Sequence, residues 1–154
     1  MKTRLLFLAF ILSSIMISCK TGNSKAAVDP PAGKNGGAVT PLTSDTFRKY
    51  VYDYQNGKTW NYKGSKPAII DFYADWCPPC RELSPLVEEV AKEYAGKIVV
   101  YKVNTDKQKA VTQALGITGL PTLLFIPMKG KPQVIMGYVP KENLEKGVNE
   151  VLLK

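Results

Sequence analysis

The strongest constraint on the fold is residues 68–74, where one acidic side chain interrupts an otherwise apolar run. The run reads Ala-Ile-Ile-Asp-Phe-Tyr-Ala and lacks the alternation of apolar and polar positions that marks a half-exposed strand. A strand that is apolar on both faces is buried on both faces, which requires helices on both sides of the sheet. The run therefore predicts the central strand of an α/β domain.

The segments around this strand alternate between helix and strand patterns. Thr43-Ser44-Asp45 predicts the capped start of a helix that reaches Tyr54, and residues 59–62 predict a short edge strand. Further along, the periodicity predicts, in order, a helix at 83–94, a strand at 98–103, a helix at 107–115, a strand at 122–126, a strand at 133–138 after a turn at 128–131, and a helix near 144–152. This order predicts a central mixed β-sheet flanked by helices on both faces.

Residues 1–18 have the pattern of an export signal. Lys2 and Arg4 precede an uncharged apolar run that is too short for a comfortable membrane-spanning helix. The sequence Met-Ile-Ser-Cys at 16–19 resembles the lipobox of bacterial lipoproteins, in which the cysteine is lipidated and becomes the mature N-terminus. We therefore expect an exported, periplasmic lipoprotein that is tethered to the membrane through Cys19. An ordinary cleaved signal and an uncleaved anchor are the alternatives.

Residues 19–41 predict a flexible tether. They are small, polar, Gly and Pro residues without an aromatic side chain, so they bury too little surface to order themselves. A flexible chain of this length has an end-to-end distance of about 25 Å. Residues 42–154 then form one folded domain.

Composition excludes several kinds of site. The chain has no histidine, which rules out His-ligated metals and Ser-His-Asp or Cys-His catalytic pairs. Lysine and arginine outnumber the acids by 21 to 13, but only three of these residues are arginine, which argues against base readout in nucleic acid. The lysines predict a solvated surface. We expect a monomer without metal or cofactor that binds no nucleic acid.

The chemistry is predicted at Cys77 and Cys80, where the central strand gives way to the next helix. Unpaired N–H groups and the positive end of the helix dipole stabilise a thiolate there, and the thiolate is the nucleophile. Pro78 and Pro79 fit the first helical turn, because a helix leaves those N–H groups unpaired. Cys77 is expected to attack a substrate disulfide and Cys80 to release the product by attacking Cys77. Half a zinc site and a purely structural disulfide are the alternatives.

Residues 71–80 and 116–122 resemble the two hallmark segments of the thioredoxin family. The first reads Asp-Phe-Tyr-Ala-Asp-Trp-Cys-Pro-Pro-Cys, and the second, Gly-Ile-Thr-Gly-Leu-Pro-Thr, resembles the loop that carries a cis-proline. The resemblance extends from Phe47 to the C-terminus and implies a thioredoxin fold with thiol-disulfide oxidoreductase activity. The site that it implies comprises the nucleophile Cys77, the resolving thiol Cys80, a cis-proline at Pro121 facing the disulfide, a substrate groove with Trp76, Leu120 and Gly137, and a buried proton-transfer group, Asp71, paired with Lys102.

Two of these roles have structural alternatives, because Asp71 could serve only as a partner of Lys102 and Trp76 could be a core residue. The direction of electron flow is also open. Pro78 stands where many thioredoxins have glycine, so the family's redox potential does not transfer unchanged. We favour reduction, because oxidant relatives usually carry a histidine between the cysteines and an extra helical domain. The implied partners are disulfide-bearing client proteins and a membrane thiol-disulfide transporter as electron donor. Alternatives are a disulfide oxidase or isomerase, a reductant for cytochrome c maturation, and a non-enzymatic binding module.

Overall fold

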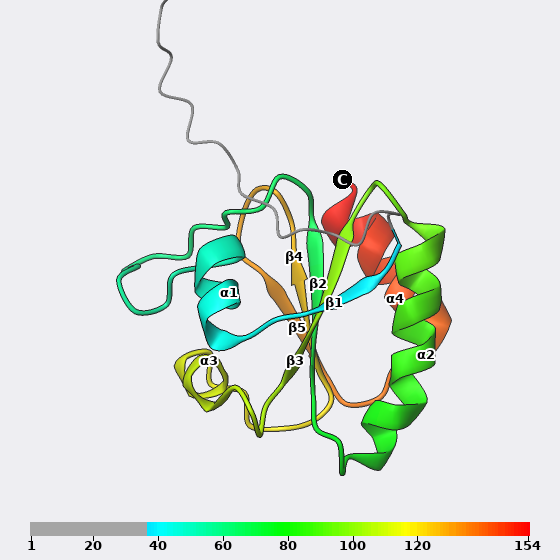
Figure 1. Ribbon diagram of the computed structural model, residues 1–154. Helices are drawn as coiled ribbons and strands as arrows, with labels where there is room; N and C mark the ends of the chain where they lie inside the picture. The colour runs from blue at the N-terminus through cyan, green and yellow to red at the C-terminus, as the bar shows by residue number, and fades with distance from the viewer. Residues whose placement is uncertain (1–36) are drawn as a thin grey trace, which may run out of the picture.

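The computed structural model describes residues 37–154, so the predicted signal at 1–18, Cys19 and most of the predicted tether lie outside the described residues. Five strands form one sheet in the order β1-β3-β2-β4-β5 (Figure 1). The strands are β1 (Val39–Pro41), β2 (Ala68–Tyr73), β3 (Val99–Asn104), β4 (Thr122–Ile126) and β5 (Gln133–Met136). The helices are α1 (Ser44–Tyr50), α2 (Pro78–Glu93), α3 (Lys109–Ala114) and α4 (Lys141–Gly147), which continues as a π-helical segment, η1 (Val148–Leu152).

The predicted central strand is confirmed. β2 pairs in parallel with β3 and antiparallel with β4, and five of its six residues are buried. Helices α1 and α3 cover one face of the sheet, and α2 and α4 cover the other (Figure 1). Each face has its own core, with Ile70 and Phe72 facing α1 and α3, and Ile69 facing α2 and α4. The mixed sheet with helices on both faces is therefore confirmed.

Helix α1 begins where its capping sequence predicts. The Thr43 hydroxyl accepts a hydrogen bond from the Thr46 N–H at 3.1 Å, and the Thr46 hydroxyl accepts one from the Thr43 N–H at 2.7 Å. The predicted extension to Tyr54 is wrong, because the helix ends at Tyr50. Tyr54 nevertheless packs against Phe47, with 6.2 Å between ring centroids. The apolar periodicity continued past the helix because the following turn still faces the same core.

The predicted edge strand at 59–62 is also wrong, since those residues form no strand. Trp60 instead packs on Tyr52, with 4.7 Å between the ring centroids. The edge position belongs to β1, which pairs in parallel with β3 and places Thr40 opposite Tyr101. The predicted tether, 19–41, therefore extends too far into the fold. Strand β1 is held by backbone pairing with β3. A strand of three residues is too short to show a pattern of alternating apolar and polar side chains, so the sequence did not reveal it.

The topology gathers three segments at one end of the sheet. Parallel strands β2 and β3 both end there, and antiparallel β4 begins there. The segments after β2, after β3 and before β4 are therefore neighbours in space. No helix within residues 37–154 combines the length and the hydropathy of a membrane span.

Candidate active site

Cys77 and Cys80 form a disulfide at this end of the sheet, with 5.3 Å between their Cα atoms. Cys77 is the N-cap residue of α2, and Cys80 lies in its first turn. Both residues are only 2% exposed. Cys77 lines a hollow of about 420 Å³, whereas Cys80 is absent from the described residues that line it. A substrate that enters the hollow therefore meets Cys77 before Cys80.

The start of α2 supplies few donors to the Cys77 sulfur. Pro78 and Pro79 occupy the first two helical positions and have no N–H, so the first free donor is the N–H of Cys80. That N–H lies 3.3 Å from the Cys77 Sγ, and the next one, from Arg81, goes to the Cys77 carbonyl. In the described part of the chain, one backbone N–H therefore reaches the sulfur. The helix dipole supports a thiolate at this position, but direct hydrogen bonding to it is limited.

Trp76 forms one wall of the hollow and is not a core residue, because it is 66% exposed. Its indole N–H donates a hydrogen bond to the Asp106 Oδ2 at 2.9 Å. Asp106 was missed in the sequence, where it lies 30 residues from Trp76. The signal that could have found it is topological: Trp76 and Asp106 follow the ends of two adjacent parallel strands.

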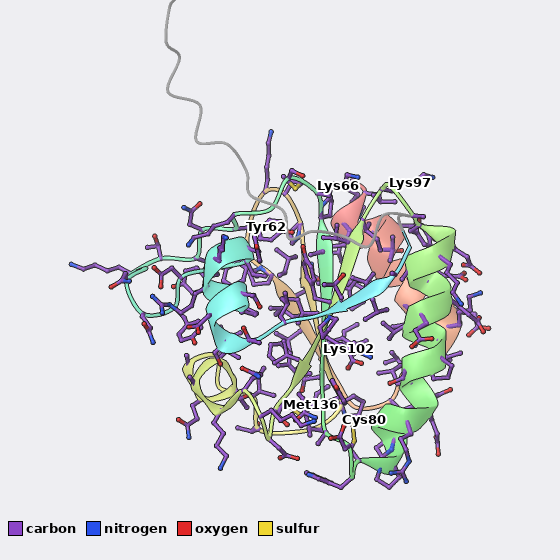
Figure 2. All side chains as sticks on the ribbon, in the orientation of Figure 1. Tyr62, Lys66, Cys80, Lys97, Lys102 and Met136 are labelled. Carbon is purple, nitrogen blue, oxygen red and sulfur yellow. A yellow bond between two sulfur atoms is a disulfide. The ribbon has the colours of Figure 1, made fainter. Side chains whose placement is uncertain are left out.

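The loop before β4 forms the opposite wall. Thr118, Gly119 and Leu120 line the hollow, and Leu120 also packs against the small cluster that Ala74 forms with the two cysteines. A second missed residue, Met136, covers this loop from β5: a Cβ placed on Gly119 would lie 2.8 Å from the Met136 sulfur. Figure 2 labels Met136 and Cys80 at the same end of the molecule. Met136 is 59% exposed and so presents an apolar surface beside the hollow.

Pro121 joins this loop to β4, and Gly137 directly follows β5. The peptide bond between Leu120 and Pro121 is cis, as the resemblance implied. The N–H of Gly137 donates a hydrogen bond to the Pro121 carbonyl at 2.8 Å, which joins the end of β5 to the loop. Gly137 has a φ of 91°, a left-handed conformation that favours glycine, and no atom lies within 4 Å of a Cβ built there. Position 137 therefore favours glycine because of its backbone conformation and not because a side chain would clash.

Asp71 is buried on the face of β2 that α2 covers. Ile69, two residues earlier, packs in the core beneath α2, and Tyr73, two residues later, packs against the cluster that contains the two cysteines. Because alternate residues of a strand share a face, the Asp71 side chain lies between these two contacts, on the cysteine side of the core. Burial raises the pKa of Asp71 to about 7, and the charge of Lys102 partly opposes this rise.

Lys102 is the register partner of Asp71 on β3, but the structure shows no ion pair between them within 4 Å among the described residues. The Lys102 ammonium instead lies 5.9 Å from the centroid of the Tyr73 ring. One carboxylate oxygen of Asp71 has no hydrogen-bond partner in the described structure. Asp71 and Lys102 are therefore neighbours that interact through their charges and form no direct ion pair. This arrangement leaves the Asp71 carboxyl group able to exchange a proton.

A buried disulfide at a helix N-terminus, with one of its cysteines lining a partly apolar hollow, defines a thiol-disulfide oxidoreductase. Within residues 37–154, no group of three or more Cys, Asp or Glu side chains is arranged to hold a metal ion.

Comparisons with known proteins agree with this class. Residues 38–150 match the family model described as Thioredoxin. The chain is 46% identical over 109 residues to the thioredoxin of Borreliella burgdorferi, covering 71% of this chain and 93% of that protein. It is 36% identical over 115 residues to thioredoxin 1 of Nostoc sp., covering 75% and 98%. The crystal structure of chloroplastic thioredoxin z superimposes with a TM-score of 0.61 at 25% identity, covering 73% of this chain and 92% of that one. The chain belongs to the thioredoxin family.

Proposed function

We propose that the protein is a membrane-tethered thioredoxin that reduces protein disulfides outside the cytoplasm. The proposed direction of electron flow, from this protein to its clients, rests on one observation. Among the described residues, one backbone N–H reaches the Cys77 sulfur, and the chain has no histidine that could add a second donor. Strong oxidants owe their high potential to a stabilised reduced form. With limited hydrogen bonding to its thiolate, this dithiol gains less from staying reduced and gives up its electrons more readily.

The reaction proceeds in two exchanges that balance. The Cys77 thiolate attacks one sulfur of a client disulfide, forms a mixed disulfide and displaces the other client sulfur as a thiolate, which takes up a proton. Cys80 then loses its proton and attacks the Cys77 sulfur, which releases the second client thiolate. The client gains two electrons, and Cys77 and Cys80 lose two as their disulfide closes. Asp71, buried on the cysteine side of the core, accepts the Cys80 proton.

The oxidised protein must then be reduced again. A reductant outside the cytoplasm has no direct access to cytoplasmic electron carriers, so we infer that a membrane thiol-disulfide transporter is its donor. The clients are proteins with exposed disulfides that enter the hollow beside Trp76. The exposed indole and Met136 suit an extended, partly apolar segment around such a disulfide.

The reduction potential tests the proposed direction. We expect the Cys77–Cys80 couple to equilibrate at about −250 mV or below, in the range of thioredoxin. The measurement uses the Cys19→Ser chain, so that Cys77 and Cys80 are the only thiols, titrated against dithiothreitol redox buffers. A value near about −120 mV would place the protein with the strong oxidants and would contradict the proposed direction.

Lipid attachment at Cys19 tests the proposed tether. Cells that express the protein are grown with a radiolabelled fatty acid, and we expect the label in the purified chain but not in its Cys19→Ser variant. The Cys77→Ser/Cys80→Ser double variant is the matched control, because it loses two cysteines but keeps the lipobox and should incorporate the label. An unlabelled wild-type chain would instead indicate an ordinary signal or an uncleaved anchor.

A further inference from the structure

The end of the molecule opposite the disulfide has its own chemical character. Strands β2 and β3 begin there and β4 ends there, since Ala68 pairs with both Val99 and Ile126. Helix α2 starts at the disulfide and runs through sixteen residues, about 24 Å, toward this far end. In Figure 2, Lys66 and Lys97 lie at one end of the domain and Cys80 at the other.

Exposed lysines gather at this far end. Lys66 precedes β2 and Lys97 precedes β3, while three further lysines line one hollow of about 500 Å³ beside the turn between β4 and β5. The same hollow is lined by two exposed apolar side chains, Met128 and Leu153, and by one acidic residue, Glu150. We call this surface the lysine face; its members are Lys66, Lys97, Lys129, Lys131, Lys154, Met128 and Leu153.

The disulfide end is charged differently. Asp75 and Asp106 flank the cysteine junction and the Trp76 indole there, together with Arg81, whose guanidinium donates a hydrogen bond to the Asp75 carbonyl. Lys107 lies 3.4 Å from Asp75, so its charge is offset by a partner. The lysine face has five lysines and, among the residues that line its hollow, one acid, Glu150, whereas Arg81, Lys107 and Lys109 stand beside two acids at the disulfide end. An anionic surface would therefore attract the lysine-face end more strongly than the other.

The chain enters the fold at the lysine-face end. A Cβ built on Gly37, the first described residue, would lie 3.1 Å from the Lys92 Cα and 3.3 Å from the Ala95 Cβ. Lys92 lies in the last turn of α2 and Ala95 directly follows its C-cap, away from the disulfide. Any tether that precedes residue 37 therefore joins the domain beside the lysine face.

We propose that the lysine face lies on the anionic phospholipid headgroups of the membrane that holds the tether. Lysines attract anionic headgroups, and long basic side chains with a few apolar neighbours are the residues that suit a bilayer interface. This contact turns the disulfide away from the bilayer, toward clients. The inference rests on the proposed tether for its membrane, but the charge and the entry point of the chain carry it independently.

Lysine acetylation in vesicles tests the contact. The lipidated full chain is placed in vesicles of phosphatidylcholine, or of equal parts phosphatidylcholine and phosphatidylglycerol, and the acetylation rate of each lysine is measured by mass spectrometry. On the anionic vesicles, we expect a severalfold lower rate at Lys66, Lys97, Lys129, Lys131 and Lys154, with no change at Lys107 and Lys109. High salt should remove the protection, because it screens the headgroup charge.

Paired variants sharpen this test. Lys129→Gln/Lys131→Gln should abolish the protection of Lys66 and Lys97, whereas the matched change at the disulfide end, Lys107→Gln/Lys109→Gln, should leave it intact. Equal rates on both vesicle types, or protection of Lys107 and Lys109 instead, would overturn the proposal. Failure of the tether has a separate signature: the chain would not float with neutral vesicles, while protection on anionic vesicles would still report the lysine face.

Discussion

The Cys80→Ser variant is expected to become covalently attached to its clients and to lose about a thousandfold or more in multiple-turnover activity. Cys77 keeps its place at the N-terminus of α2 and still attacks the client disulfide. The sulfur that should displace the client is gone, and a serine hydroxyl does not replace it in thiol-disulfide exchange. Mixed disulfides should therefore accumulate on non-reducing gels and disappear when dithiothreitol is added.

Cys77→Ser is the matched control, because it changes the other member of the same disulfide. It should lose activity to a similar extent but trap no clients, since Cys80 is absent from the residues that line the hollow. Trapping by Cys77→Ser in place of Cys80→Ser would reverse the order of attack. If the double serine variant retained biological function, the cysteines would be idle and the protein would act as a binding module.

The sequence could predict the parts of the fold that depend on burial. Residues 68–74 are apolar on both faces, and that alone placed β2 in the centre of the sheet. The cysteine pair could be located in the same way, because a strand pattern stops and a helix pattern starts around it. Edge strand β1 could not, since it is held by backbone pairing that side-chain periodicity does not report.

Contacts across the sheet end were also beyond a linear pattern. The hydrogen bond from Trp76 to Asp106 joins residues that only the parallel pairing of β2 and β3 brings together. The sequence could predict that Asp71 and Lys102 are neighbours, but not whether their side chains form an ion pair. Two residues in register share a face, yet the rotamer of a long lysine side chain decides whether an ion pair closes.

The Asp71→Asn variant is expected to unfold less readily than the wild type at pH 8, by up to about 4 kcal/mol. Burial raises the pKa of Asp71 from its ordinary 3.8 to about 7. Between about pH 4 and pH 7, the folded state keeps a proton that the unfolded state has lost, so the free energy of unfolding falls as the pH rises through this range. Asparagine is neutral throughout and removes this loss.

Urea unfolding of the oxidised protein at pH 4 and pH 8 measures the effect. The difference between variant and wild type should be large at pH 8 and small at pH 4, where Asp71 is protonated in the folded protein and only partly ionised in the unfolded chain. Asp53→Asn is the matched control, because hydrogen bonds donated by Asn56 and Arg48 lower the pKa of this half-buried carboxylate to about 2. Its charged form favours folding, so its replacement should decrease stability at pH 8.

The same substitution should slow the second chemical step more than the first. Cys80 must lose a proton before it attacks Cys77, and Asp71 is the buried carboxylate on the sheet face beneath α2. In the wild type, the rate of this step should rise with pH through about 7 as Asp71 becomes able to accept the proton. In Asp71→Asn, rapid mixing with a disulfide substrate should show a mixed disulfide that persists, with the initial attack little changed. Equal slowing of both steps would indicate instead that Asp71 only shapes the core. If the variant is more stable than the wild type but slower in the second step, the buried carboxylate serves the reaction and lowers the stability of the fold.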